Sequence, residues 1–308
     1  MRNVTLKQLR ALAAVARTGS MTAAAHELHV TAPAVTLQLR LLEESAGLPL
    51  LDRTSDGFRL TEAGTEVLAH VQRIERSLAD CAEALELLSG GRGRVSVGVV
   101  STAKYFAPRA LGAFCVAHPK VELRLMVGNR STIYSSLANY ELDLAIAGTP
   151  PDTFAIESAT IGPHPFVFIG PPGHPLAKRR RLSLADLAGE TVLLREQGSG
   201  TRVLMERLVR SANVEWRTHR EMGSNETIKQ TVMAGLGIAL ISAHTIAAEI
   251  RAGSLIVFDV EGLPAMRTWS VIKRKDKRLL PAGQALWNFL GTSGAQFLPE
   301  IPQSATAT

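Results

Sequence analysis

Small polar side chains at the start of one predicted helix could hydrogen-bond to the edges of DNA bases. Residues 20–44 predict two short helices joined by a tight turn, a geometry that brings the end of the second helix into a DNA major groove. Ser20 and Thr31 each stand where a helix would begin, and both residue types favour the capping position. The candidate DNA contacts in this segment are Ser20, Thr31, Ala32, Pro33, Thr36, Leu37 and Arg40.

An apolar stripe predicts which face of the second helix is buried. Val35, Leu39 and Leu42 fall on one side at helical spacing, which leaves polar candidates on the opposite side. An amphipathic helix pair that binds nothing has the same pattern. The pattern alone therefore favours neither interpretation over the other.

A short hairpin follows the helix pair. Residues 51–61 read as two strands, and Asp56-Gly57 is a dipeptide that favours the turn between them. Arg53 and Thr54 are candidate contacts to DNA phosphates in this hairpin. The alternative is that these side chains are only solvated, so the prediction depends on the neighbouring helix pair.

Polar loops that could bind an anion come directly after predicted strands, where backbone N–H groups and helix dipoles point in doubly wound sheets. The turn 197–202 combines glycines, two hydroxyls and an arginine, which suits a carboxylate or a phosphate, although such turns also occur without a ligand. The basic run Lys178–Arg181 is typical of a solvated face more than of a second anion site. The candidate ligand-binding residues are Ser101, Thr102, Arg130, Ser131, Gly200, Thr201, Arg202, Asn225 and Thr227.

No arrangement typical of catalysis or metal binding stands out. His164 and His174 have no partner at metal-ligand spacing, and the serines lack the turn of a hydrolase nucleophile. Cys81 and Cys115 lie far apart and predict reduced thiols, with redox sensing as the alternative. We therefore expect no catalytic residue, no metal and no cofactor, only a small-molecule ligand.

Composition bounds the class of protein. The 308 residues carry a formal net charge of +6, a pI near 9.6 and 46% hydrophobic residues. This balance fits two or three domains with real cores, and it favours polyanionic partners without requiring them. No signal peptide and no membrane-spanning run are predicted, so we expect a cytoplasmic protein with no membrane partner.

A long helix that begins at Thr61 carries a narrow apolar seam. The seam residues alternate spacings of four and three among polar neighbours, which is the pattern of a two-helix coiled coil. A helix packed on its own domain is the alternative. We expect a second copy of the chain as the partner of this seam, which comprises Val67, Val71, Ile74, Leu78, Cys81, Leu85 and Leu88.

The composition changes at Ser89–Arg94, which reads as a glycine-rich hinge. Beyond it, strands alternate with helices, which predicts parallel sheets with covering helices. The expected strands are 95–100, 121–127, 142–147, 166–169, 191–194, 238–241, 255–260 and 268–273. The expected helices are 103–117, 131–140, 202–211, 226–234, 243–252 and 281–297, and the tail 299–308 is expected to fray.

The order of these features resembles the LysR-type transcriptional regulators. Ala32 and Leu37 stand where that family usually has a glutamine and an arginine, so base readout at these two positions departs from the family's pattern. The matching motifs, at unbroken spacing, are Leu6-Lys7-Gln8-Leu9-Arg10, Leu28-His29-Val30-Thr31, Leu42-Glu43-Glu44, Gly47-Leu48-Pro49-Leu50-Leu51-Asp52-Arg53 and Leu60-Thr61-Glu62-Ala63-Gly64.

The resemblance implies an all-α winged helix-turn-helix with a long linker helix, followed by an α/β two-lobed effector domain similar to a periplasmic binding protein. It also implies double-stranded promoter DNA, a homodimer or dimer of dimers, RNA polymerase, and a small effector in the cleft between the lobes. The expected divisions are 1–61 for DNA binding, 62–89 for the coiled-coil linker, 90–94 for the hinge, 95–302 for the effector domain and 303–308 for the tail. Lobe I is expected at about 95–162 and 268–302, and lobe II at about 163–267.

Three short segments resemble one subgroup more narrowly, the regulators of carbon-dioxide-fixation (RuBisCO) operons. They are Gly98–Pro108, Thr36–Arg40 and Gly198–Arg202. This resemblance implies a sugar phosphate, phosphoenolpyruvate or NADPH as effector. The alternatives are a LysR-type regulator of another metabolic operon, or a solute-binding or enzymatic α/β protein whose N-terminal helices only mediate assembly.

Overall fold

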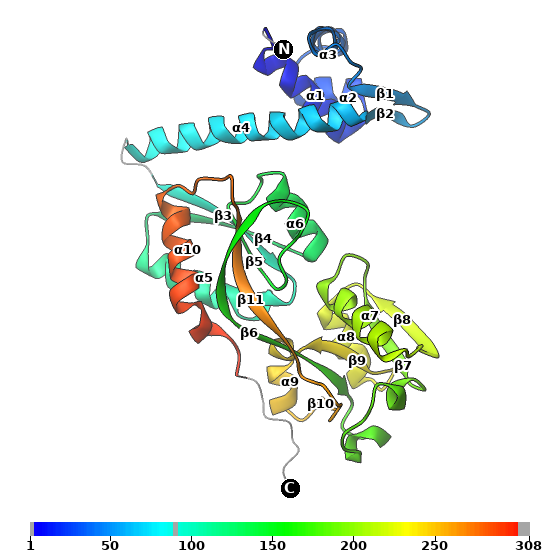
Figure 1. Cartoon of the computed structure of the whole chain (residues 1–308). Coiled ribbons are helices and arrows are strands. Elements are labelled where there is room, and N and C mark those ends of the chain that lie inside the picture. Colours follow the sequence, from blue (N-terminus) through cyan, green and yellow to red (C-terminus); the bar gives the residue numbers. More distant parts are fainter. Residues whose placement is uncertain (1–2, 89–91, 301–308) are drawn as a thin grey trace. The chain divides into compact units, whose positions relative to one another are not determined.

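The chain divides into two compact units, residues 1–85 and 86–308. The computed structural model describes residues 3–88 and 92–300 (Figure 1). The expected tail 303–308 and the start of the expected hinge therefore lie outside the described residues. Gly93 and Arg94, which were expected in the hinge, instead begin the strand β3 (Gly93–Val100), where their backbone pairs with the neighbouring strand.

The described part of the first unit packs three short helices against the start of a long one. The short helices are α1 (Leu6–Thr18), α2 (Met21–Glu27) and α3 (Ala32–Ala46), and the long one is α4 (Glu62–Leu88). Thr5 and Gln8 form a capping box at the start of α1, while Gly19 and Gly47 end α1 and α3 with positive φ. The core contains Leu12, Val15, Ala24, Val35, Leu42 and Leu50.

The predicted hairpin is present as β1 (Leu51–Thr54) and β2 (Gly57–Leu60). Its turn is Ser55-Asp56, one residue earlier than expected, and Gly57 begins β2 with a φ of 130°. Phe58 N donates to Gly19 O at 2.9 Å, and a Cβ at position 57 would lie 2.3 Å from that same oxygen. Glycine is therefore required where the hairpin meets the end of α1.

The apolar seam of α4 is divided between two environments. Val71 is fully buried in the core of its own unit and Val67 packs against that core, so the expectation of a partner helix is wrong for these two positions. Ile74, Leu78 and Leu85 are exposed by 41%, 43% and 62%. The prediction of a partner helix therefore applies only to the later positions of the seam, from Ile74 onward. The side chain of Leu88 lies outside the described residues.

The main sheet of the second unit has the strand order β10-β6-β11-β5-β3-β4, and β9 also pairs with β6. β3 is parallel to β4 (Val121–Gly128) and β5 (Leu144–Ala147), as expected. The expectation of wholly parallel sheets is wrong, because β6 (Ile156–Gly170) and β11 (Ala265–Arg274) run antiparallel to each other. β11 is also antiparallel to β5, and β6 is antiparallel to β9 (Ala239–Ser242) and β10 (Ile256–Val257).

β6 connects the two lobes of this unit, since it pairs with β11 along its first part and with β9 along its last part. The strand is much longer than the expected 166–169. Its earlier part contains Pro163 and Pro165, residues that do not indicate a strand in the sequence. A second sheet pairs β7 (Thr191–Arg195) in parallel with β8 (Thr218–Met222), a strand that the sequence did not predict. Phe166 and Phe168 pack on one face of β6, and Val167 and Ile169 pack on the other.

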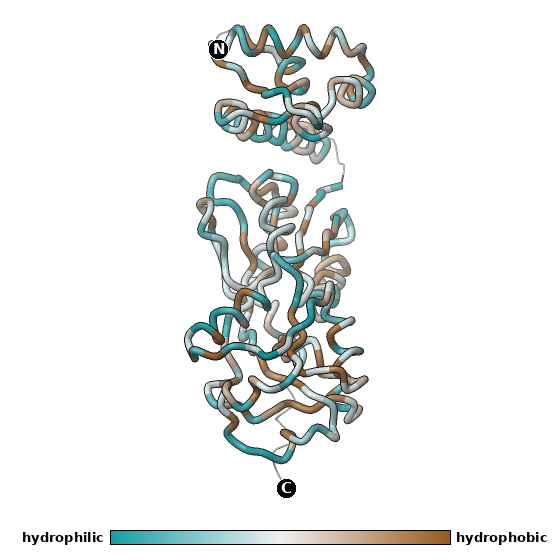
Figure 2. Tube along the Cα trace, turned by 90° about the vertical axis from the view of Figure 1, so that its right-hand side faces the viewer, coloured by the Kyte–Doolittle hydropathy of each residue, from teal (hydrophilic) through white to brown (hydrophobic). Residues whose placement is uncertain are grey.

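Helices cover both lobes. In lobe I they are α5 (Ala107–Ala117), α6 (Arg130–Ala138) and α10 (Pro281–Ser293), and in lobe II α7 (Gly200–Ala212), α8 (Asn225–Met233) and α9 (Ala247–Arg251). Short 3₁₀ turns replace three parts of the expected helices, at Ala103–Tyr105, Ala243–Thr245 and Gly294–Phe297, and two more occur at Pro175–Lys178 and Ala185–Leu187. Figure 2 shows hydrophobic residues inside this unit and hydrophilic residues along its outer loops.

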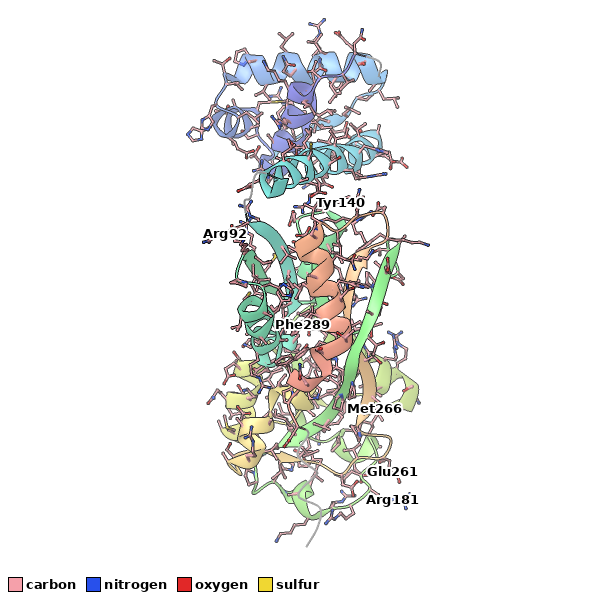
Figure 3. The ribbon with its side chains drawn as sticks, turned by 90° about the vertical axis from the view of Figure 1, so that its left-hand side faces the viewer. Arg92, Tyr140, Arg181, Glu261, Met266 and Phe289 are labelled. Carbon is pink, nitrogen blue, oxygen red and sulfur yellow. The ribbon has the colours of Figure 1, made fainter. Side chains whose placement is uncertain are left out.

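The basic run Lys178–Arg181 lies on the surface at one end of the second unit. Arg179 forms an ion pair with Asp186, and Arg181 lies 3.4 Å from the carboxylate of Glu261 (Figure 3). Exposed pairs of this kind contribute little to stability. Among the described residues, no helix is long and apolar enough to cross a membrane.

Candidate DNA-binding surface and ligand cavity

The helix pair exposes most of the predicted DNA contacts. Ser20 caps α2 by accepting a hydrogen bond from Ala23 N at 3.4 Å, whereas Thr31 occupies the capping position of α3 without a side-chain capping bond. The predicted stripe of Val35, Leu39 and Leu42 is buried. The opposite face of α3 is therefore free to meet a ligand, and Pro33 lies in its first turn.

The side chains on this free face differ in what they can still bind. Thr36 donates its hydroxyl proton to Ala32 O at 3.0 Å, so only its oxygen lone pairs and its methyl group are available. Leu37 is 53% exposed, and an apolar group there can contact only an apolar partner such as a thymine methyl. Arg40 forms an exposed ion pair with Glu44 at 2.9 Å, which DNA phosphate could replace.

Of the two hairpin residues predicted to contact phosphate, Arg53 and Thr54, only Arg53 is basic. Arg53 is exposed on β1 opposite Phe58. Thr54 is half-buried and donates to Gly57 O at 3.2 Å, so its hydroxyl stabilises the turn. Of the two predicted phosphate contacts, Arg53 is the one whose side chain reaches solvent.

A small cavity of about 40 Å³ lies where the two lobes of the second unit meet. The loop after β3 and the start of α6 border it from lobe I, and the start of α7 borders it from lobe II. Five of the predicted ligand-binding residues line it, namely Ser101, Thr102, Arg130, Gly200 and Thr201. The lining that the sequence did not predict consists of Val100, Tyr134, Gly148, Thr149, His164, Phe166, Ser199 and Arg267.

The charge around this cavity is positive. Among the residues that line it in the described chain are two arginines and no carboxylate. Arg267 donates to Thr149 Oγ1 at 2.9 Å, and its pKa is lowered by burial and by the positive charges of Arg207 and Arg130. Such crowding of cations without an acid is unfavourable in the empty protein and is relieved when an anion binds.

Helix ends add hydrogen-bond donors to this charge. The first N–H groups of a helix have no partner within it, and the Ser199 side chain at the start of α7 makes no capping bond. At the start of α6, Asn129 Oδ1 already accepts from Thr132 N at 3.0 Å. The free donors at this edge of the cavity therefore belong to α7.

Four predicted ligand-binding residues lie outside this cavity. Arg202 donates to the carboxylates of Glu206 and Glu221, so the expectation that it supplies the free positive charge is wrong. Ser131 is exposed beside a neighbouring hollow, and its N–H donates to Gly198 O at 3.1 Å. Asn225 is buried behind the cavity, and Thr227 is exposed at the first turn of α8.

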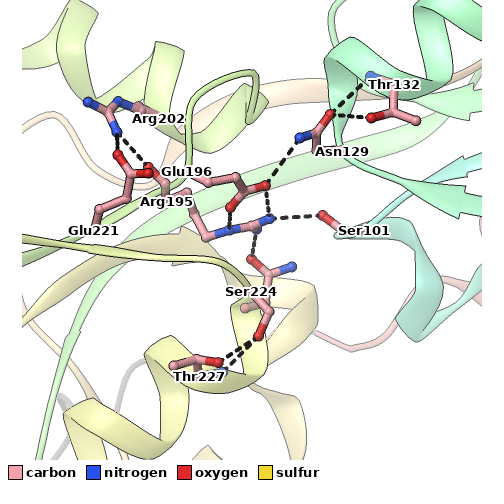
Figure 4. A network of polar contacts seen from close by, with 10 residues as sticks. Ser101, Asn129, Thr132, Arg195, Glu196, Arg202, Glu221, Ser224 and Thr227 are labelled. Carbon is pink, nitrogen blue, oxygen red and sulfur yellow. Dashed lines mark hydrogen bonds and ion pairs between the residues drawn. The ribbon is translucent and has the colours of Figure 1, made fainter.

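Arg195 is the buried cation that the sequence did not reveal (Figure 4). It is 3% exposed at the end of β7, donates to Asn225 Oδ1 and lies 2.6 Å from Glu196 Oε2. Its Nη2 also donates to Ser101 Oγ of lobe I at 3.3 Å. The only sequence signal was an Arg-Glu pair directly after the apolar strand residues 191–194.

Further contacts join the lobes at the same edge. Asn129 Nδ2 donates to Glu196 Oε1 at 3.5 Å, and Tyr105 donates its hydroxyl to Glu226 Oε2 at 3.4 Å. The ammonium group of Lys229 lies 4.9 Å from the centre of the Tyr105 ring. Any separation of the lobes must exchange these polar contacts for other partners.

The sequence predicted no catalytic or metal-binding role for two histidines and two cysteines. His174 lies 3.4 Å from Glu190 Oε2, while His164 lines the cavity. Within residues 3–88 and 92–300, no three His, Cys, Asp or Glu side chains gather as a metal site. Cys81 is exposed and Cys115 partly buried, both as free thiols.

Comparison with known proteins identifies relatives for both units. Residues 6–65 match the model described as bacterial regulatory helix-turn-helix protein, lysR family, and residues 89–295 match the LysR substrate binding domain. The chain is 50% identical over 301 residues to the HTH-type transcriptional regulator CbbR of Xanthobacter flavus, covering 97% of this chain and 90% of that protein. It is 43% identical to the RuBisCO operon transcriptional regulator of Allochromatium vinosum, covering 96% and 98%. The resemblance to this subgroup is confirmed.

Solved structures extend the comparison. The regulatory domain of Synechocystis PCC6803 CcmR in complex with 2-PG matches with a TM-score of 0.63 and 35% identity, covering 65% of this chain and 96% of that domain. Full-length CbnR complexed with its target DNA matches with a TM-score of 0.62 and 24% identity, covering 93% and 98%. The predicted fold class, a winged helix-turn-helix followed by a two-lobed α/β domain, is confirmed.

Replacing Arg195 should destabilise the second unit. We expect Arg195→Met to lower its free energy of unfolding by about 3 kcal/mol, because the buried partners lose their cation. The matched variant Arg202→Met should cost about 1 kcal/mol or less, because its partners Glu206 and Glu221 are solvated. All three tryptophans lie between residues 216 and 287, so urea unfolding followed by tryptophan fluorescence reports on this unit. Equal losses in both variants would contradict the structural role of Arg195.

Proposed function

The chain belongs to the LysR family of bacterial regulatory helix-turn-helix proteins, and we propose that it controls a carbon-dioxide-fixation operon in response to a small anionic metabolite. The observation that carries this proposal is identity of 43% over nearly the whole chain to a regulator named for the RuBisCO operon. As a LysR-type transcriptional regulator it is a DNA-binding protein and not an enzyme. We infer that it acts in the cytoplasm, where promoter DNA is located.

For DNA binding, we propose that α3 enters the major groove of promoter DNA and that the hairpin follows the phosphate backbone. The exposed face of α3 carries Thr36, Leu37 and Arg40, and Arg53 extends from β1. Arg40 and Arg53 have the charge for phosphate, whereas Thr36 and Leu37 suit base edges. RNA polymerase remains an expected partner, and the divisions 1–61, 62–89, 90–94, 95–302 and 303–308 remain our assignment of domains.

For the effector, we propose a small acid carrying a phosphate or carboxylate in the cavity between the lobes. Arg130 and Arg267 supply charge there, while Ser101, Thr102 and Thr201 supply hydroxyls. CcmR, whose regulatory domain was solved with 2-PG, supports this class of ligand by its 35% identity. Among the expected effectors, phosphoenolpyruvate and a sugar phosphate are smaller than NADPH and therefore require less separation of the lobes.

For assembly, we propose that Ile74, Leu78 and Leu85 of α4 pack against a second copy of the chain. Their exposure leaves a row of apolar side chains at coiled-coil spacing on a helix whose other faces are polar. A homodimer would bury this row of side chains. A dimer of dimers would need a second contact elsewhere on the chain.

Two substitutions should distinguish phosphate contact from base contact. Arg53→Ala removes one phosphate contact, so it should weaken binding to every sequence and reduce the slope of log K against log salt by about one. Thr36→Ala should instead reduce the preference for the promoter over random DNA. Binding measured by fluorescence anisotropy at several salt concentrations checks both. Equal loss on promoter and random DNA for Thr36→Ala would reject its role in base readout.

A charge in the exposed seam should prevent assembly. In Leu78→Glu, two like charges would face each other across the dimer, so the dimer should dissociate and promoter affinity should fall with it. Ser77→Glu places the same charge at the adjacent exposed position and should leave the dimer intact. Analytical ultracentrifugation at a fixed concentration measures the assembly state. An unchanged oligomer in Leu78→Glu would show that the contact lies elsewhere.

A matched pair of threonine substitutions should test the cavity. Thr201→Val removes a hydroxyl that lines the cavity, so 2-PG affinity should fall roughly tenfold, whereas Thr227→Val removes one outside it and should change affinity less than about twofold. Isothermal titration calorimetry on the full chain provides both affinities. If the two variants bind alike, the ligand sits elsewhere than this cavity.

A further inference from the structure

His164 is placed in the floor of the cavity and its ring is held rigidly. The residue belongs to β6 opposite Arg267 of β11, and it is only 3% exposed. Its ring stacks on Trp269 with 3.6 Å between ring centres and 14° between planes, and Phe166 packs against it at 4.3 Å. A ring enclosed in this way cannot turn to find another partner.

One nitrogen of His164 has a partner and the other has none. Nε2 lies 3.1 Å from Ser242 Oγ, and Ser242 is fully buried. Nδ1 is buried without a hydrogen-bond partner among the described residues, and the side chain lines the cavity. A histidine that served only to pack against Trp269 would not explain this orphaned polar atom.

Ser242 determines which nitrogen of His164 carries the proton. The buried hydroxyl has a proton to donate, and Nε2 is the acceptor that the described structure gives it. When Nε2 accepts the serine proton it is unprotonated, and the proton of the neutral ring is then on Nδ1. The opposite tautomer would leave the serine proton without an acceptor in a site closed to water.

The ring is neutral, and Gly148 is the neighbour of its Nδ1 atom. Burial, with the neighbouring His244 and the positive charge of Arg267, lowers the pKa of His164 well below its usual value. A Cβ on Gly148 would lie 3.3 Å from Nδ1, so only the lack of a side chain at this position avoids a tight contact with this atom. Gly148 lines the same cavity, as do the arginines Arg130 and Arg267.

We propose that His164, held in its Nδ1–H tautomer by Ser242, donates a hydrogen bond to an acidic oxygen of the ligand. The proposal rests on the ligand-binding role of the cavity, which it makes specific. The two arginines attract any small anion, whereas a rigid neutral donor selects an anion that places an oxygen at one point. His164 is thus a specificity-determining residue, and Ser242 is a positioning residue that acts through it.

Substitutions on both sides of the contact test this role by calorimetric titration of the full chain with 2-PG. His164→Phe keeps the stack on Trp269 but removes both nitrogens, and 2-PG affinity should fall roughly tenfold to a hundredfold. Gly148→Ala places a methyl group against Nδ1 and should produce a loss of at least about tenfold although His164 itself is kept. His164→Asn offers an amide nitrogen near the position of Nδ1 and should recover part of the affinity.

The tautomer has a readout that does not depend on the ligand. In the NMR spectrum of the ligand-free protein with labelled histidine nitrogens, the residue whose signals disappear in His164→Phe should show a protonated Nδ1 and an unprotonated Nε2. In Ser242→Ala this tautomer should no longer dominate, and 2-PG affinity should fall roughly threefold to tenfold. A protonated Nε2 in the wild type would overturn the proposal.

The outcomes separate this inference from the proposed function. If the wild type binds 2-PG and both His164→Phe and Gly148→Ala bind it equally well, His164 is not a donor, although the cavity still binds the anion. If the wild type binds neither 2-PG nor inorganic phosphate, the ligand-binding role of the cavity fails and the donor role fails with it. Should His164→Phe not fold, Gly148→Ala and the tautomer decide the question.

Discussion

The pairing of β6 with β11 is the constraint on which the second unit depends, because β6 is continuous from one lobe into the other. This pairing sets His164 opposite Arg267, so two residues that are far apart in the sequence share the floor of the cavity. Movement of one lobe relative to the other must bend these strands.

The charge of the cavity explains why it is suited to an anion and not simply to water. Arg195 is buried nearby, but its charge is already compensated by Glu196. Arg130 and Arg267 have no carboxylate among their neighbours in the cavity lining, and the pKa of Arg267 is lowered as a result of burial and like charge. The charge of Arg195 is therefore compensated within the protein, whereas that of Arg267 is suited to an anion. Composition alone cannot distinguish these two arginines.

Sequence periodicity predicted the helix pair, the hairpin and the parallel strands because each is recorded in local spacing. The loops after β3 and before α7 were predicted for the same reason, and Ser101, Thr102, Gly200 and Thr201 do meet in one cavity. His164 and Arg267 were missed because antiparallel register between distant strands leaves no local signal, and the prolines 163 and 165 concealed β6. One acid partner of Arg202, Glu221, comes from the strand β8 and left no local signal, whereas the other, Glu206, lies four residues along the same helix.

The lobes meet through hydrogen bonds that a ligand must compete with. Arg195 already donates to Ser101 Oγ, and the backbone N–H of Ser131 donates to Gly198 O across the same boundary. A ligand can shift the arrangement of the lobes only by binding one arrangement more tightly than another. A ligand that displaces either hydrogen bond changes the energy of that arrangement by the energy of its own bonds minus that of the bonds it displaces. Because Ser101 and Gly198 lie in loops of opposite lobes, the hydrogen bonds that they make must change whenever the lobes move relative to each other.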